Sequence, residues 1–543
     1  MDGTTPPQGD PGASAQPWGY GPAGPQPPYD GQPNTTRGLR ALVLSVVLTL
    51  LVGGGAFAFY QVDPFHLFRA GPQASEALPA NAVFYAGLDL DPTASQKISA
   101  LRFLNHFPAF RENAGLTDAN ADVREALVGQ AIDGLHCPGV DYAHDVRPWL
   151  GERFGVAVMP AGAQGPTPVA VAVQVSDDDA ARTGVEALNA CDDAVSGGLP
   201  GESSALGISF VNGYLLLAET QSQADAYARS ADAHPLADDP DFMADLDSLG
   251  DLGVVTLWAD IVGLVDAYGS GLTDAGQLDV LTSTVGRVAA TVRFASDHVE
   301  VASSIYGDTP AVDHDDNPIV SLPDTTVFAM SESGGDQRVA TAWKKSIARA
   351  RSGNPAIDRQ ISQFAARSGL SLPADLETLL GHNVLLALDK QGLSAQALSA
   401  DDLSVLNFGA RFTNDPAKLG ALYDKLVDLI RTETGSDIPF VRRDLEDGIA
   451  VATNDAYAAR LGSLDGNLGD SDDFTSVVDD GAGKEFVMFL NFDAIKDQVM
   501  QAMEDGGVEQ AVLENLRPLK AFGITAEVDG HYQHVTMRLS VDD

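Results

Sequence analysis

The densest group of reactive side chains lies between His136 and Asp145, in the sequence His-Cys-Pro-Gly-Val-Asp-Tyr-Ala-His-Asp. A histidine beside a carboxylate can act as a general base or bind zinc. The rival interpretation is a surface loop held by a disulfide. We favour the loop, because the corresponding stretch of a second, similar region keeps only the last aspartate, as Asp375.

The thiol in this group has one possible partner, because the chain contains two cysteines, Cys137 and Cys191. In an oxidising compartment an even number of cysteines indicates a disulfide. Closing a loop of roughly 50 residues would stabilise the fold by about 4 kcal/mol. We therefore predict a Cys137–Cys191 disulfide and assign neither thiol to catalysis or to a metal.

Two oxygen-rich stretches resemble calcium loops in part. Asp313, Asp315 and Asn317 alternate as calcium ligands do, with Asp324 at the twelfth position, but Pro318 stands where such a loop needs glycine. The second stretch begins a predicted helix, where N-capping explains its carboxylates without a metal. Its members are Asp465, Asn467, Asp470, Asp472 and Asp473. We assign no metal site, and calcium binding by these loops stays an open alternative.

Signatures of common catalytic and cofactor sites are absent from the sequence. It has no Gly-x-Ser-x-Gly, His-Glu-x-x-His or Ser-x-x-Lys motif, and no Rossmann glycine pattern at a strand-to-helix turn. Gly481-Ala-Gly-Lys484 lacks the hydroxyl residue that holds magnesium in a phosphate loop and precedes a predicted strand. We therefore expect no catalytic residues and no cofactor. The alternative is an extracytoplasmic hydrolase whose site lies in an interdomain cleft and leaves no motif.

The sequence that forms the elements needed to position any site occurs as two similar copies. Matched residues keep the same order at offsets of 230–244 residues, which indicates a duplicated domain and not a short solenoid repeat. The pairs include Leu78 with Leu322, Asp145 with Asp375, Gly151 with Gly381, Asp225 with Asp455, Asp241 with Asp473, Trp258 with Asn491, and His298 with His534. We place the first repeat at residues 77–307, a polar linker at 308–320 and the second repeat at 321–543.

Each repeat reads as a mixture of amphipathic helices and short alternating strands. In the first repeat, Asn212-Gly213 between two apolar runs predicts a tight hairpin. Most of the predicted strands alternate apolar and polar residues, as in an antiparallel sheet with one solvated face. The predicted fold class is therefore α+β: two duplicated α+β domains with mainly antiparallel sheets, preceded by a single N-terminal transmembrane helix.

That helix is predicted from the amino-terminal sequence. Residues 1–38 are rich in Pro and Gly and are expected to be a disordered cytoplasmic tail. Residues 39–60 are mostly apolar, and about 22 residues make a helix of roughly 33 Å, enough to cross a bilayer core. Arg37 and Arg40 place the tail inside and residues 61–543 outside the cell, after a juxtamembrane linker at 61–76. The alternative is a signal peptide cleaved after Ala56-Phe-Ala58.

The charge of the chain limits its partners. Its 76 acidic and 33 basic residues give a formal net charge of −43. With no basic patch expected, nucleic acid is excluded as a partner and anionic lipid head groups are repelled at short range. We interpret the acidic surface as a means of solubility, and attraction of cations or of a basic partner is the alternative.

Three stretches of the first repeat resemble the sequence of one known family. They are the entry Leu78–Pro92, the helix residues Leu101–Leu104 and the stretch Arg147–Gly151. Together with the amino-terminal anchor they resemble an actinobacterial membrane-anchored family that carries the domain of unknown function 3352. The resemblance extends over nearly all of residues 71–543. It implies a location in the cell envelope and no particular activity, ligand or catalytic residue.

From these observations we expect a binding or scaffold protein of the bacterial cell envelope, not an enzyme. Its predicted attachment is to the cell membrane, through one helix with a cytoplasmic N-terminus. Its expected partner is an envelope protein, a lipid or a wall ligand.

Overall fold

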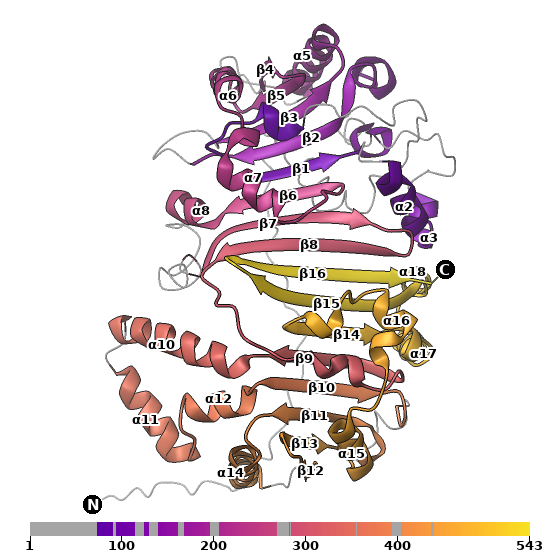
Figure 1. The fold of residues 1–543 in the computed structure, drawn as a ribbon. Coiled ribbons are helices and arrows are strands. Elements are labelled where there is room, and N and C mark those ends of the chain that lie inside the picture. Colours follow the sequence, from indigo (N-terminus) through magenta and orange to yellow (C-terminus); the bar gives the residue numbers. More distant parts are fainter. Residues whose placement is uncertain are drawn as a thin grey trace, which may run out of the picture.

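The computed structural model describes residues 73–90, 94–113, 124–129, 140–160, 168–195, 206–268, 282, 284–353, 356–393, 403–435 and 439–542. Within them, strands of one antiparallel sheet run through both repeats, with helices packed on its faces (Figure 1). The fold is therefore α+β, as predicted.

The first repeat contributes strands β1 to β8. The strands are β1 Phe84–Asp89, β2 Leu150–Val158, β3 Val169–Val175, β4 Gly207–Val211, β5 Tyr214–Ala218, β6 Val255–Asp260, β7 Val285–Phe294 and β8 His298–Gly307. The main helices are α2 Ala94–Leu104, α3 Pro108–Asn113, α5 Asp178–Val195, α6 Gln221–Ala233, α7 Pro240–Asp247 and α8 Ile261–Tyr268. Short helical turns are η2 Ala74–Ala77, η3 Glu125–Gly129, η4 Tyr142–Val146 and η5 Leu236–Asp238.

The second repeat contributes strands β9 to β16 in the same order. The strands are β9 Thr326–Ser333, β10 Asn383–Asp389, β11 Phe408–Thr413, β12 Val441–Asp444, β13 Gly448–Ala452, β14 Phe486–Asn491, β15 Leu519–Asp529 and β16 Tyr532–Val541. The helices are α10 Gly335–Gly353, α11 Ile357–Ser368, α12 Ala374–Leu380, α14 Pro416–Thr434, α15 Asp455–Ser463, α16 Asp472–Thr475, α17 Lys496–Asp505 and α18 Gln510–Leu516. Short turns are η7 Pro318–Ser321, η8 Leu403–Val405, η9 Leu468–Asp470, η10 Gly481–Gly483 and η11 Asp493–Ile495.

The strand order makes the duplication visible. From one edge to the other it is β12-β13-β11-β10-β9-β14-β15-β16-β8-β7-β6-β1-β2-β3-β5-β4. Each half of this order repeats the other in reverse, so the two copies are related by a pseudo-two-fold axis between β8 and β16. The predicted Asn212-Gly213 hairpin is confirmed, because both residues have the positive φ of a type I′ turn, 52° and 79°.

The predicted fold class is wrong in two respects. It expected two domains with separate sheets, but β16 pairs antiparallel with β8 from Tyr532–Tyr306 to Ser540–His298. It also expected a membrane-spanning helix. Among the described residues, none of the helices combines the length and apolar character needed to cross a membrane. The predicted tail, the predicted span at 39–60 and most of the juxtamembrane linker lie outside the described residues.

One pairing of the two repeats is also corrected. The backbone N–H of Gly263 donates to Asp260, and that of Ala494 donates to Asn491, so Asp260 and Asn491 cap the same turn. Asn491 is therefore the counterpart of Asp260, two residues after Trp258. The counterpart of Trp258 is Phe489, since each forms an edge contact with the matched ring of Phe242 or Phe474.

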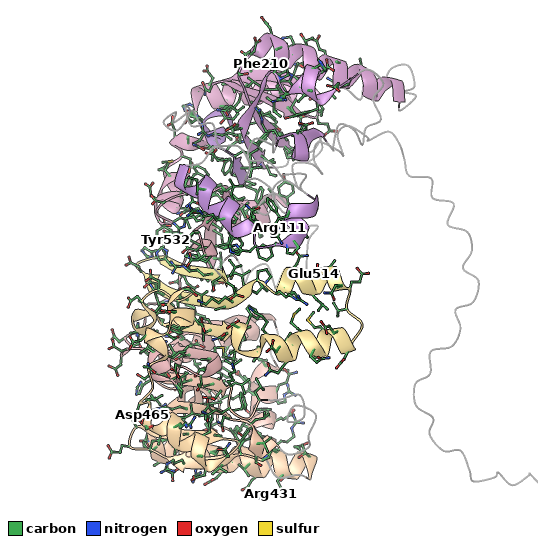
Figure 2. The ribbon with its side chains drawn as sticks, turned by 90° about the vertical axis from the view of Figure 1, so that its right-hand side faces the viewer. Arg111, Phe210, Arg431, Asp465, Glu514 and Tyr532 are labelled. Carbon is green, nitrogen blue, oxygen red and sulfur yellow. The ribbon has the colours of Figure 1, made fainter. Side chains whose placement is uncertain are left out.

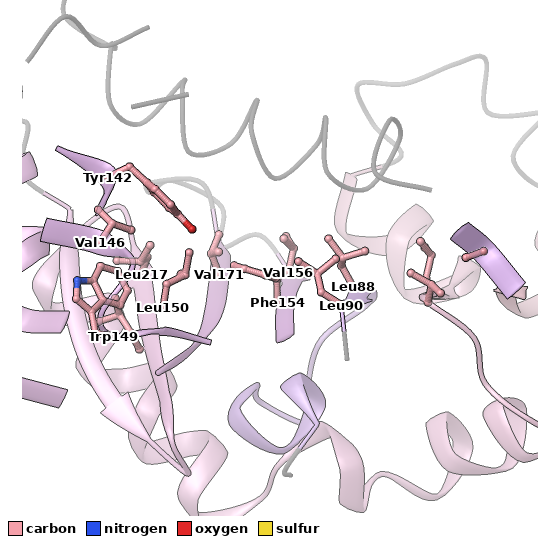
Figure 3. Packing of buried hydrophobic residues seen from close by; sticks show 14 of the residues in the cluster. Leu88, Leu90, Tyr142, Val146, Trp149, Leu150, Phe154, Val156, Val171 and Leu217 are labelled. Atoms are coloured by element: carbon pink, nitrogen blue, oxygen red, sulfur yellow. The ribbon is translucent and has the colours of Figure 1, made fainter. Parts of the chain in front are cut away.

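The two repeats differ in how the faces of their part of the sheet are covered. In the first repeat, alternate strand residues fill two clusters, one on each face, and Figure 3 shows the one around Phe154 and Trp149. In the second repeat one cluster is formed, around Phe474 and Tyr457. The first repeat is thus covered on both faces, whereas the described part of the second repeat has a buried core on one.

Candidate functional site

The most promising site is a pocket in the second repeat, which we call the linker pocket. Its volume is about 330 Å³, and it lies between the linker and the adjoining ends of β9, β10 and β11. It is lined by Asp313, His314, Asp315, Asp316, Pro318, Ser333, His382, Asn383, Arg411, Thr413, Asp447 and Leu464.

Strand register brings the polar residues of the floor together. Asn383 pairs with Ser333 on one side and with Thr413 on the other. Arg411 lies two residues before Thr413 and therefore on the same face of β11. This is the face that carries the buried core of the second repeat, so the pocket is a polar extension of that core.

Asn383 is buried, with 6% of its surface exposed, and its hydrogen bonding is incomplete. Its Nδ2 donates to Ser331 Oγ and Ser333 Oγ, both at 3.0 Å, whereas its Oδ1 has no partner. Exchanging the amide oxygen and nitrogen does not help, because the two serines would then satisfy the oxygen and leave the nitrogen without a partner. An unpaired buried polar atom costs about 1–3 kcal/mol.

Arg411 is the second incompletely bonded residue. Its guanidinium donates to Asp447 Oδ2 at 2.6 Å and to the carbonyls of Leu461 and Gly462 at 3.2 Å. Its Nε is buried without a partner. Two residues that line the pocket therefore each carry a buried polar atom without a partner. Both atoms are closed to solvent, so a ligand in the pocket reaches them only when the neighbouring side chains move.

The rim of the linker pocket is acidic. Asp313, Asp315 and Asp316 are exposed along one side, and Asp447 offsets the charge of Arg411 on the other. His382 lies at the rim with its Nδ1 3.3 Å from Asp336 Oδ2. This arrangement of carboxylates favours a ligand that carries positive charge.

The linker is held in place by its own polar contacts. Asn317 is fully buried; its N–H donates to Ala482 O and its Nδ2 to Lys484 O. Gln337 exchanges two hydrogen bonds with the backbone of Asp313. These contacts fix the acidic rim over the strand ends.

Different side chains occupy the matched position of the first repeat. There Arg153 stands in the place of Asn383 and forms an ion pair with Asp89 at 3.0 Å. Tyr214, which is fully buried, occupies the position of Gly448. In the first repeat Tyr214 pairs with Gln174, and in the second repeat Gly448 pairs in the same way with Thr413. Burial raises the pKa of Tyr214 above its ordinary value. A large ring thus stands where the second repeat has a glycine.

The His136–Asp145 group is described from residue 140 onward. Asp141 accepts hydrogen bonds from the N–H and Nδ1 of His144, at 3.1 and 2.8 Å, and these bonds lower the pKa of Asp141. Asp145 accepts from the N–H of Asp141, as Asp375 accepts from Ser371. The carboxylates therefore cap a helical turn that both repeats share. Cys137 lies outside the described residues, and the predicted disulfide stays a prediction.

The two calcium-like stretches do not come together as cation sites. Asp313 and Asp315 line the linker pocket, whereas Asp324 lines a separate, open hollow with Arg460, Asp465 and Asn467. In the second stretch, Asp473 at the start of α16 accepts a hydrogen bond from Asn491 Nδ2 at 2.8 Å. Within the described ranges, no group of three or more His, Cys, Asp or Glu residues is arranged to hold a metal ion.

Two other features from the sequence have structural roles. Lys484 of the glycine stretch pairs with Glu527 at 2.7 Å, and a strand follows it, as predicted. Trp149 and Trp258 are buried in the core, and both donate hydrogen bonds through Nε1.

One serine–histidine pair could not be predicted from the sequence, because its members lie 230 residues apart. Ser304 Oγ lies 2.9 Å from His534 Nδ1 where β8 pairs with β16. Such a pair suits nucleophilic catalysis when a substrate can reach the hydroxyl. Ser304 is 1% exposed, so the pair serves the joint between the repeats and not a reaction.

Comparison with known proteins gives one match. Residues 42–196 match the model of a family described as a protein of unknown function (DUF3352). The predicted resemblance to this domain is therefore supported over those residues. No curated protein and no solved structure is similar to the chain.

Proposed function

We propose that the chain is a non-catalytic binding protein and that the linker pocket of its second repeat holds the ligand. The observation that carries this proposal is the incomplete hydrogen bonding of Asn383 and Arg411, two buried residues that line one pocket. Buried polar atoms in folded proteins are nearly always paired. Four buried side-chain atoms lack a partner in the described residues, and two of the four belong to residues that line this pocket.

The chemistry of the pocket defines the class of ligand. An amide or hydroxyl group can donate to Asn383 and accept from Arg411. The acidic rim favours an ammonium group near it. The ligand is therefore a small polar molecule that combines hydroxyl or amide groups with an amine, as an amino sugar does.

The bacterial cell envelope, outside the cytoplasm, is the proposed place of action. The support for it is the strongly acidic composition of the chain, with a net charge of −43. In such an oxidising compartment we expect Cys137 and Cys191 to form a disulfide. Intact mass after export tests this location, because a disulfide lowers the mass by two hydrogens. Two free thiols would contradict it.

The binding proposal is tested by calorimetric titration with glucosamine against glucose, which lacks the amine. We expect heat of binding from glucosamine, and weaker binding after Asp315→Asn together with Asp316→Asn on the rim. The matched control changes Asp232 and Asp247 to Asn, two exposed residues of the first repeat, and should leave binding unaltered. Equal heats for the two sugars, or equal loss in the control, would reject an amine-specific pocket.

A further inference from the structure

The helices between β9 and β10 reverse the charge of the molecule locally. Residues 335–368 form α10 and α11, which we call the basic arm, and they contain seven basic and two acidic residues, a net charge of +5. The whole chain carries −43. The expectation that the chain has no basic patch is therefore wrong for this arm.

Three cations of the basic arm are exposed and have no acidic partner. Lys344, Arg359 and Arg367 form no ion pair in the part of the chain that the structure describes. Others of the arm are paired, as Lys345 is with Asp308 and Arg351 with Asp358. The unpaired cations are free to meet an external negative charge.

Helix α11 is amphipathic, and its apolar side is only partly covered, with Phe364 exposed. Ile357, Ile361, Phe364 and Ala365 follow the spacing of one helix face. No residue of α11 is buried, and Phe364 is 41% exposed. Arg359 lies on the opposite side of the helix, and Arg367, three residues after Phe364, lies at the edge of the apolar side.

The first repeat treats the same position differently. Its helices between β1 and β2, α2 and α3, bury Phe103, Leu104 and Phe110 in a core cluster. In the second repeat the equivalent helices lie to one side of the sheet, where Figure 1 shows α10 and α11 beyond the ends of β9 to β11. The duplicated fold therefore does not require an exposed aromatic residue at this place.

We propose that the basic arm is a docking surface for an anionic lipid surface, with α11 lying in the head-group region. A helix with cations on one side and an exposed aromatic residue on the other lies at such interfaces, with its apolar side toward the acyl chains. Charge complementarity selects the partner, because anionic lipids attract nearby Lys and Arg side chains. The acidic body is repelled by the same surface, so contact is confined to the arm.

The test is hydrogen–deuterium exchange on the full chain, followed at the peptides of α11. We expect protection of α11 when phosphatidylglycerol–phosphatidylcholine vesicles are added and none with phosphatidylcholine alone. The protection should decline as salt is raised. Following one helix in this way separates the arm from any other attachment of the chain.

Variants identify the groups that are responsible. Arg359→Glu with Arg367→Glu should weaken the vesicle-dependent protection by about tenfold or more, since each basic residue contributes to attraction. Phe364→Ser should weaken it while leaving the charge unchanged. The charge-matched control is Arg182→Glu with Arg229→Glu, two exposed residues of the first repeat. In this variant, anionic vesicles should protect α11 as strongly as in the natural chain.

Other outcomes would overturn the proposal. They are no protection with anionic vesicles, equal protection with neutral vesicles, or an equal loss in the control. Protection of α11 that rises with protein concentration in the absence of vesicles would instead assign the arm to contact with a second copy of the chain.

Discussion

At the scale of single residues, the Asp245 carboxylate gathers hydrogen bonds from three other side chains. It is 1% exposed and accepts hydrogen bonds from Trp258 Nε1 at 2.8 Å, Arg287 Nε at 2.7 Å and Tyr532 Oη at 2.9 Å. Burial and the bond to Asp245 raise the pKa of Tyr532 to about 12, which keeps its hydroxyl a donor. Because Tyr532 belongs to the second repeat, this carboxylate joins the two copies; Tyr532 is labelled at the joint in Figure 2.

The first prediction concerns this carboxylate. Asp245→Asn should lower the free energy of unfolding by about 3–5 kcal/mol, because it leaves Arg287 without its buried counter-charge. Urea unfolding measures the change. Asp241→Asn is the control in the same helix: this exposed residue lies 3.4 Å from Arg287, and its loss should cost less than about 1 kcal/mol. Equal costs would mean that burial of the pair does not decide its importance.

At the scale of elements, the linker is part of the fold and not a spacer between domains. Val312 packs against Gly334, where an added Cβ would lie 2.5 Å from the valine side chain. Asn317 ties the linker to the turn before β14. These contacts hold residues 313–316 where they line the linker pocket, so the linker both connects the repeats and forms one side of that pocket.

The second prediction tests this segment. Asn317→Ala should remove about 1–3 kcal/mol of stability, because it leaves the buried carbonyl of Lys484 and the N–H of Ile319 without their side-chain partners. It should also increase cleavage between residues 308 and 317 in limited proteolysis. Asp316→Ala, at an exposed neighbour, is the control and should change neither measurement. An unaltered cleavage rate in Asn317→Ala would show that the asparagine does not hold the linker.

At the scale of the whole molecule, the repeats are joined through a charged pair within the sheet. Glu300 of β8 lies directly opposite Arg538 of β16, with Oε2 2.7 Å from the arginine Nε, and it also binds Arg293. Burial alone would raise the pKa of Glu300, but the hydrogen bonds and charges of Arg538 and Arg293 outweigh it and lower the pKa below 4.5. On the other face, Ala109 N donates to Asn515 Oδ1 across the joint.

The third prediction follows from that pKa. A lowered folded-state pKa gives stability that is present above about pH 4.5 and is lost as the pH falls through the folded value. Glu300→Gln should therefore lower the free energy of unfolding by about 2–3 kcal/mol at pH 7, and the difference from the natural chain should shrink below pH 4. Thermal unfolding of both proteins at a series of pH values from 7 to below 4 measures the loss of stability and its dependence on pH. Asp479→Asn, an exposed residue 3.9 Å from Arg538, should show no such pH dependence.

Much of the architecture could be predicted from the sequence, because it rests on local rules. Apolar alternation, the Asn212-Gly213 turn and capping residues such as Asp239 specify strands and helices from near neighbours. The duplication was readable because matched residues keep their order. Sequence matching placed Asn491 against Trp258, and the cap hydrogen bonds moved it to Asp260, since register depends on contacts and not on residue identity.

The joint and the pocket were decided by tertiary structure. Pairing of β8 with β16 brings together residues about 230 positions apart, and nothing in either strand distinguishes this partner from another edge. The linker pocket combines Asp313, Asn383 and Arg411 from three segments, and their unpaired atoms appear only once neighbouring strands have taken up the other hydrogen bonds. The sequence by itself determined the two copies and their elements; the single sheet and the unsatisfied pocket arise from non-local contacts, which composition and periodicity do not encode.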